Sequence, residues 1–80
     1  MATDTAALLD YLIRALVDDP DAISIVRTET PGGELFEVTV AADDVGKVIG
    51  RSGRIIKALR TLMRAAASVD GHHIDLEILG

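Results

Sequence analysis

Apolar residues in the first quarter of the chain recur with the period of an α-helix. Over residues 4–18 they form one stripe, made up of Leu8, Leu9, Leu12, Ile13, Leu16 and Val17. Thr3 or Thr5 is positioned to cap this helix. Asp4 favours the positive end of its dipole, and Pro20 ends it.

Apolar and polar residues alternate in three further segments, which predicts β-strands. The segments 22–29 and 34–40 flank the turn sequence TPGG at 30–33 and should form a hairpin. The third strand covers residues 72–79, close to the C-terminal end of the sequence.

Two helices separate the second and third strands. A short helix capped by Asp43 or Asp44 precedes the tetrapeptide GRSG at 50–53, and a longer helix over residues 54–69 follows it. The sequence Asp-Gly at 70–71 closes the longer helix.

The resulting order α-β-β-α-α-β predicts an α+β fold. A crossover made of two helices joins the strands 34–40 and 72–79, which should therefore lie parallel and adjacent. The strand at 22–29 pairs antiparallel with strand 34–40 on its other edge. All three helices can then cover one face of a three-stranded mixed sheet.

Composition narrows the class of protein. Eighty residues make one domain, over residues 1–80, and the absence of cysteine excludes disulfides and thiolate sites. No apolar run reaches the ~18–20 residues that span a bilayer. The N-terminal residues lack the basic region of a signal peptide, so we expect a cytoplasmic protein away from membranes. The only aromatic residues are Tyr11 and Phe36, both expected in the core, which leaves no platform for stacking bases.

Positive charge is concentrated in one segment of an acidic chain. The net charge is −5, yet six of the eight basic residues fall within 45–69, where there is no acidic residue. An acidic protein with one strongly basic segment is suited to a polyanionic partner at that segment.

The tetrapeptide between the two helices has the features of a phosphate site. Gly50 and Gly53 allow the backbone to turn sharply and leave room for close approach. The amides and dipole at the start of the following helix favour an anion. Arg51 and Arg54 flank the turn, so phosphate binding is expected there.

The helix that follows the turn has two distinct faces. Its apolar arc holds Ile55, Ile56, Leu59, Leu62, Met63 and Ala66. Its basic arc holds Arg54, Lys57, Arg60 and Arg64. A basic stripe that continues from an anion site suits an extended polynucleotide backbone more than a single phosphate.

The segment VIGRSGRII at 48–56 resembles the V-I-G-x-x-G-x-x-I core of KH domains, whose GXXG loop holds about four nucleotides of single-stranded RNA or DNA. The element order is similar to the type II KH arrangement. The whole chain resembles the small, single-domain bacterial KhpA family, most closely in the run GKVIGRSGRIIKALRTLMRA.

The resemblance implies a role for each residue around the loop. The sugar-phosphate backbone would be held by Gly50, Arg51, Ser52 and Gly53. An apolar floor for the bases would come from Ile49 and Ile56. Positive charge would come from Lys47, Arg54, Lys57 and Arg60. The edge of the last strand near His73 and Ile74 would offer backbone groups to the bases.

The implied function is a non-catalytic RNA-binding protein that grips short single-stranded RNA. The family further implies a post-transcriptional regulator or RNA chaperone linked to cell elongation, division and shape. It also implies a homodimer, and pairing with a larger KH protein of the Jag/EloR type. Aspartate at both Gly50 and Gly53 should then abolish RNA binding with little effect on melting temperature.

Two other functions remain open from the sequence. The domain could serve mainly as a dimerisation subunit of a larger KH-containing partner, with RNA binding secondary. Two helices around a glycine turn also fit a helix-turn-helix DNA binder, although the three-stranded sheet counts against it.

Catalysis and metal binding have no support in the residue pattern. His72 and His73 are adjacent in a strand and point to opposite faces, so they cannot share one ion. The acidic pairs at 18–19 and 43–44 are interpreted as helix-end and capping residues. We therefore expect no enzyme activity, no cofactor and no metal.

Overall fold

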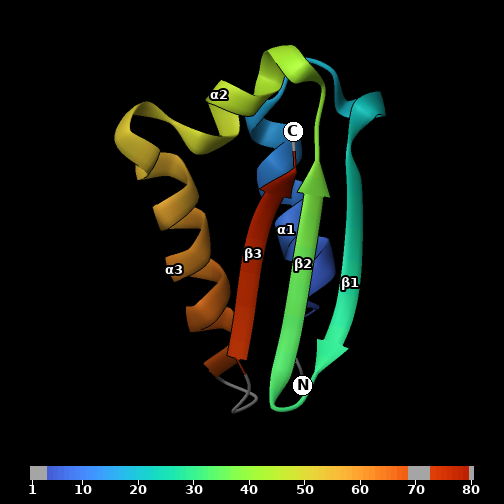
Figure 1. Ribbon diagram of the computed structural model, residues 1–80, viewed down its shortest axis with the longest axis vertical. Coiled ribbons are helices and arrows are strands. Elements are labelled where there is room, and N and C mark those ends of the chain that lie inside the picture. The colour runs from blue at the N-terminus through green and yellow to red at the C-terminus, as the bar shows by residue number, and fades with distance from the viewer. Residues whose placement is uncertain (1–3, 69–72, 80) are drawn as a thin grey trace.

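The computed structural model describes residues 4–68 and 73–79, and it arranges them as a three-stranded sheet with helices packed against one face (Figure 1). The elements in chain order are α1 (Thr5–Leu16), β1 (Ser24–Thr30), β2 (Gly33–Thr39), α2 (Val45–Ile49), α3 (Arg54–Ser68) and β3 (His73–Leu79). Short 3₁₀ turns precede β1, α2 and α3, at Pro20–Ala22, Ala42–Asp44 and Arg51–Gly53.

The sheet has the predicted topology. Its strand order is β1-β2-β3, with β1 antiparallel and β3 parallel to the central β2. Phe36 of β2 lies opposite Arg27 of β1 and Leu76 of β3. The α+β class, the mixed sheet and the α-β-β-α-α-β order are confirmed, and β3 is left as an edge strand beside α3.

The core lies between the inner face of the sheet and the helices. Its buried apolar residues are Leu9, Ile13, Phe36, Val38, Val40, Val48, Ile56, Leu59, Met63, Ala67, Ile74 and Leu76. Phe36 is buried as predicted. Tyr11 is 71% exposed, so its expected place in the core was wrong. It lies two residues from Leu9, which is about half a helical turn, and therefore faces solvent.

The buried side of α3 also differs slightly from the predicted arc. Leu62 is 51% exposed, whereas Ala67 is fully buried. Leu59, Met63 and Ala67 of α3 all belong to the buried core, and Leu62 does not. Helical period alone indicates an apolar arc and leaves open how much of it the neighbouring elements cover.

The N-cap of helix α1 lies between the two predicted caps, Thr3 and Thr5. Asp4 is the N-cap, because its Oδ1 accepts a hydrogen bond from the amide of Ala7 at 3.0 Å. Thr5 is the first helical residue, and its buried hydroxyl donates to Glu34 at 3.0 Å. The helix ends at Leu16, ahead of Pro20, which opens a 3₁₀ turn. Thr3, the other predicted cap, and the Asp-Gly closure at 70–71 lie outside the described residues.

A buried carboxylate fastens the α1–β1 connection to α2. Asp44 is 2% exposed, and its two oxygens accept hydrogen bonds from the amides of Asp18 and Asp19 at 3.2 and 3.1 Å. Lys47 donates to the same carboxylate at 3.1 Å. Asp44 occupies the N-cap position of α2 but makes no side-chain cap bond, so its predicted capping role was wrong. The carboxylate instead satisfies amides 25 and 26 residues away.

The stability of this connection is expected to depend on pH. Burial alone would raise the pKa of Asp44, but the hydrogen bonds from the amides of Asp18 and Asp19 and from Lys47 outweigh burial and lower that pKa. A carboxyl whose pKa is lower in the folded state stabilises the fold above its unfolded pKa, and this contribution is lost as pH falls through the folded pKa. The urea midpoint of Asp44→Asn should therefore lie below that of the parent at about pH 7. The difference between the two midpoints should disappear towards about pH 2.

The exposed neighbour Asp43 supplies the control for that measurement. Asp43→Asn removes an equal charge from the same turn without touching the buried amides, so its urea midpoint should stay near the parent value at both pH values. Equal midpoints for Asp44→Asn and the parent at neutral pH would contradict the assigned role of Asp44.

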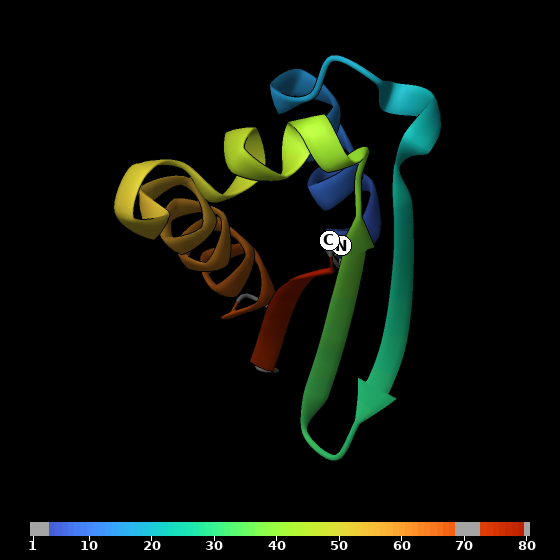
Figure 2. The same cartoon turned by 45° about the horizontal axis from the view of Figure 1, so that its top comes forward.

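None of the helices within residues 4–68 and 73–79 combines the length and the apolar character needed to cross a bilayer. Figure 2 shows that α2 and α3 meet at a bend that stands away from the sheet. This bend contains the GRSG tetrapeptide, which we call the GXXG loop (Gly50–Gly53).

Candidate nucleic-acid interface

The GXXG loop is built from residues with left-handed backbone angles. Gly50 has φ +76° and ψ 170°, Ser52 has φ +56° and Gly53 has φ +71°. A Cβ on Gly50 would lie 2.6 Å from Cγ1 and 2.9 Å from the backbone nitrogen of Ile55, whereas a Cβ on Gly53 would meet nothing closer than 3.8 Å. Gly50 is thus required by both conformation and space, and Gly53 by conformation.

The apex of the loop is open to solvent. Arg51 and Ser52 are exposed and form the outermost turn between the two helices. The amide of Gly53 donates to the carbonyl of Gly50 at 3.1 Å, and the amide of Arg54 is used by the 3₁₀ turn. Within the described chain the amides of Arg51 and Ser52 have no such acceptor. The loop apex therefore offers two main-chain donors to an anion, immediately before the first turn of α3 where the sequence placed such donors.

The six basic residues of the segment divide into two groups. No hydrogen bond or ion pair engages the side chains of Arg51, Arg54 and Lys57 within residues 4–68 and 73–79, and all three are exposed. They follow the loop into the first turn of α3. These three cations, together with the apex amides, form a positively charged end on the molecule.

Lys47 belongs to the second group. Its ammonium contacts the carboxylates of Asp18 and Asp44, and the hydrogen bond that it donates to Asp18, followed by the one to Asp44, raises its pKa. The side chain bridges α2 to the α1–β1 connection. The structure therefore places Lys47 beside the loop but with its charge balanced by two acidic partners.

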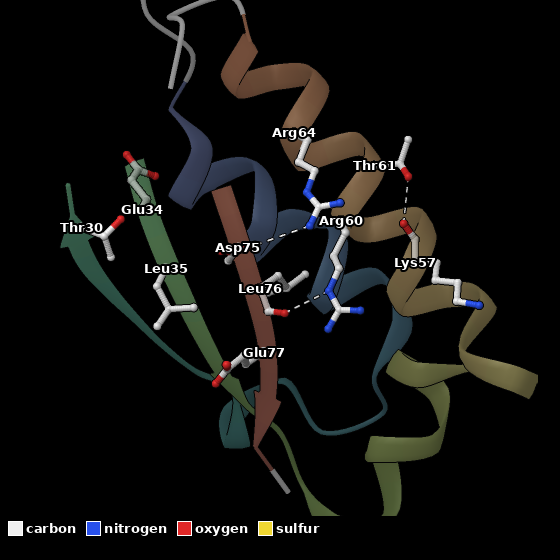
Figure 3. A pocket seen from close by; sticks show the side chains of 10 residues that line it. All are labelled: Thr30, Glu34, Leu35, Lys57, Arg60, Thr61, Arg64, Asp75, Leu76 and Glu77. Atoms are coloured by element: carbon white, nitrogen blue, oxygen red, sulfur yellow. Dashed lines mark hydrogen bonds and ion pairs between the residues drawn. The ribbon is translucent and has the colours of Figure 1, made fainter. Parts of the chain in front are cut away.

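A groove of about 750 Å³ continues from this charged end between α3 and β3 (Figure 3). Its lining residues are Thr30, Glu34, Leu35, Lys57, Arg60, Thr61, Arg64, Asp75, Leu76 and Glu77. The wall contributed by α3 is basic, whereas β3 contributes two exposed carboxylates, Asp75 and Glu77. A polyanion in this groove would be held on the α3 side and repelled from the face of the sheet.

The two arginines in this wall reach the edge of β3. Arg60 donates through Nε to the carbonyl of Leu76 at 3.2 Å, and Arg64 donates through Nε to the carbonyl of Ile74 at 3.4 Å. Arg64 also lies 3.5 Å from Oδ1 of Asp75. Both guanidinium groups thus cover the strand edge (Figure 3).

The backbone of His73 faces the interior of the sheet. Its amide donates to the carbonyl of Gly32 at 3.1 Å, which is a bond on the β2 side. Because backbone groups alternate along a strand, Ile74, Leu76 and Ile78 direct theirs to the free edge. Of the two residues predicted at this edge, Ile74 presents its backbone there and His73 does not.

The two isoleucines expected beneath the bases have different positions. Ile56 is 8% exposed and belongs to the core, and Ile49 is partly buried against it. Neither lines the groove. Its apolar lining residues are Leu35, which is partly exposed, and Leu76, which is 2% exposed and belongs to the core. Sequence reasoning missed Leu35 and Thr61 as lining residues because only the packing of α3 beside β3 brings them to one groove.

The part of the chain that the structure describes contains no group of three or more His, Cys, Asp and Glu side chains that could hold a metal ion. His73 lies within that part and is exposed; His72 lies outside the described residues.

An exposed GXXG loop between two helices, beside a mixed sheet in α-β-β-α-α-β order, defines a type II KH domain and sets it apart from a helix-turn-helix domain. A family profile described as the KH domain of KhpA/KhpB matches residues 6–78. The chain belongs to the KhpA/KhpB KH-domain family.

Full-length relatives support this membership. The chain is 43% identical over 79 residues to RNA-binding protein KhpA of Treponema pallidum, covering 99% of both chains. It is 43% identical to RNA-binding protein KhpA of Leifsonia xyli, covering 92% of this chain and 95% of the relative. The relative from Chlamydia trachomatis, also called RNA-binding protein KhpA, is 41% identical, with 89% and 91% covered.

Solved structures share the fold. An Era variant from Aquifex aeolicus bound to GDP and AlF4⁻ superposes with a TM-score of 0.67 at 19% identity, over 92% of this chain and 29% of Era. Era in complex with MgGDPNP and nucleotides 1506–1542 of 16S ribosomal RNA gives a TM-score of 0.68 at 19% identity, over 92% and 28%. The similarity therefore covers this whole domain and a smaller part of Era.

Proposed function

We propose that this protein is a non-catalytic binder of single-stranded RNA that holds the sugar-phosphate backbone at the GXXG loop. The observation that carries the proposal is the exposed loop apex. There two amides lie beside the cations Arg51, Arg54 and Lys57, and among the described residues neither these amides nor these side chains have a partner. The relatives from Treponema pallidum and Chlamydia trachomatis, which match this chain over almost its full length, are named RNA-binding proteins.

The charges of the groove orient the bound strand in this proposal. Phosphates lie on the loop and along the basic wall of α3, because Asp75 and Glu77 repel them from β3. The bases then face the edge of β3 and the partly exposed side chain of Leu35. A duplex does not fit this arrangement, since its bases are paired and cannot enter a groove of this kind.

A salt titration tests the proposal. Three unpaired cations that neutralise three phosphates predict a slope of about −2 for log K against log salt with a single strand. Fluorescence anisotropy of a labelled single-stranded octamer and of the matching duplex gives both affinities, and the single strand should bind more tightly. Absence of RNA binding, or preference for duplex DNA, would contradict the proposal.

Self-association forms a second part of the proposal. An apolar groove of about 290 Å³ lies between α1 and α3, and the exposed Leu62 lines it together with Leu12, Leu16 and Ile55. An apolar surface of this kind suits a homodimer, or pairing with a Jag/EloR-type KH protein. Sedimentation velocity on the anisotropy samples gives the oligomeric state with and without RNA.

The cellular part of the proposal follows from family membership. We place the protein in the cytoplasm as a post-transcriptional regulator or RNA chaperone, connected with cell elongation, division and shape. Crosslinking in cells followed by sequencing of the retained RNA identifies its targets and tests this role.

A further inference from the structure

The free edge of β3 is covered by donors from α3. The carbonyls of Ile74 and Leu76 point out of the sheet towards α3, and each accepts a hydrogen bond from an arginine. A bare strand edge would offer these carbonyls to hydrogen-bond donors on a base. With the guanidinium groups in front, the groove offers hydrogen-bond donors instead.

Arg60 is the better placed of the two arginines. Its Nε is anchored on Leu76, its side chain is partly buried, and its two terminal nitrogens have no partner among the residues described. Arg64 is 57% exposed and one of its terminal nitrogens faces Asp75. Figure 3 shows the Arg60 guanidinium between the helix and the strand, inside the groove.

A guanidinium held at Nε presents its remaining donors as a fixed, planar fork. Such a fork matches a base edge that carries two adjacent acceptors. Guanine offers O6 and N7 in this way, and cytosine offers O2 and N3 in a single strand. Adenine carries its amino group beside N7. One donor of the guanidinium would therefore face another hydrogen-bond donor.

We propose that Arg60 is a specificity-determining residue, which selects a base with two adjacent acceptors over adenine in the groove between α3 and β3. The inference rests on the proposed RNA binding and adds the base preference to it. Without the anchor on Leu76 the fork would be mobile, and its selectivity would fall because the donors would no longer be held in one plane. Arg60 thus binds the edge of β3 through Nε and selects the base through its two terminal nitrogens.

The test compares four labelled heptamers of sequence UUUNUUU, in which N is G, C, A or U. The parent protein should bind the G or the C heptamer at least about fivefold more tightly than the A heptamer. The separate G and C arms show which base is preferred. Arg60→Lys keeps the charge but loses the fork, so the ratio of the affinity for the G or C heptamer to that for the A heptamer should fall to about one.

Arg54→Lys is the matched control, because Arg54 lies on the same helix and donates to none of the strand residues that the structure describes. It should lower the affinity for all four heptamers alike and keep the parental ratio. A parental ratio in Arg60→Lys would mean that Arg60 only covers the strand edge, which overturns the inference.

Binding measurements on the parent protein distinguish failure of the base preference from failure of the proposed RNA binding. Binding to all four heptamers with equal affinity would overturn the base preference and leave RNA binding in place. Failure to bind any of them would contradict the proposed function itself. Equal affinities of the parent protein overturn the inference even if Arg60→Lys fails to fold, which its melting curve reports.

Discussion

Replacing the two central residues of the GXXG loop with aspartate, in the double variant Arg51→Asp and Ser52→Asp, should abolish RNA binding and leave the fold intact. Both side chains are exposed and neither has a partner within residues 4–68 and 73–79. Both glycines are kept, and aspartate is one of the residues that tolerate the left-handed conformation of Ser52 (φ +56°). Like charges brought together at an interface cost several kcal/mol, so the affinity should fall at least about a hundredfold.

The measurement pairs anisotropy titrations with thermal melts. A charge-matched control places the same change elsewhere, with Arg14→Asp on α1 and Thr28→Asp on the outer face of β1, both exposed positions away from the loop. The control should lose far less affinity than the loop variant. Retained binding by a folded loop variant would reject the loop as the phosphate site.

Gly50→Ala should destabilise the fold strongly. Its φ of +76° with ψ of 170° lies in a region that is almost closed to residues other than glycine, which costs about 1–3 kcal/mol. The added Cβ would lie 2.6 Å from Cγ1 of Ile55 and 2.9 Å from its backbone nitrogen, and such overpacking costs about 1–3 kcal/mol more. The sum is a large part of the total stability of a small domain.

Urea unfolding measures this loss, with Gly53→Ala as the control. Gly53 shares the positive φ (+71°), but its Cβ would have 3.8 Å of clearance, so the cost should be about 1–2 kcal/mol. Equal stabilities for the two alanine variants would show that Ile55 yields to the added methyl group without cost.

Gly50 also changes how the loop can be tested. Aspartate at both glycines was expected to leave the melting temperature nearly unchanged, and for Gly50 the close approach of Ile55 makes that expectation wrong. Loss of binding in that variant would reflect unfolding as well as loss of the site. Substitution of Arg51 and Ser52 avoids this ambiguity, because both residues already carry a Cβ and aspartate adds none beside Ile55.

The sequence by itself determined the topology and the position of the loop. Alternation in the strands, the helical period of α1 and α3, and two glycines three residues apart are local signals, and local backbone preferences express them directly. The right-handed crossover rule then placed β3 beside β2. These signals were sufficient for the α-β-β-α-α-β order and for the exposed GXXG loop.

The tertiary structure alone decided which basic residues of the segment find a partner within the part of the chain that the structure describes. Lys47 meets Asp18, which lies 29 residues away, and Arg60 meets the carbonyl of Leu76, which lies 16 residues away. Charge counting along the chain treats Lys47, Arg60 and Arg51 alike, because it contains no distances between remote residues. Hydrogen bonds and ion pairs form only where packing brings donors and acceptors within reach. The fold therefore divides the basic segment into an exposed cluster at the loop and the arginines Arg60 and Arg64, which donate to β3.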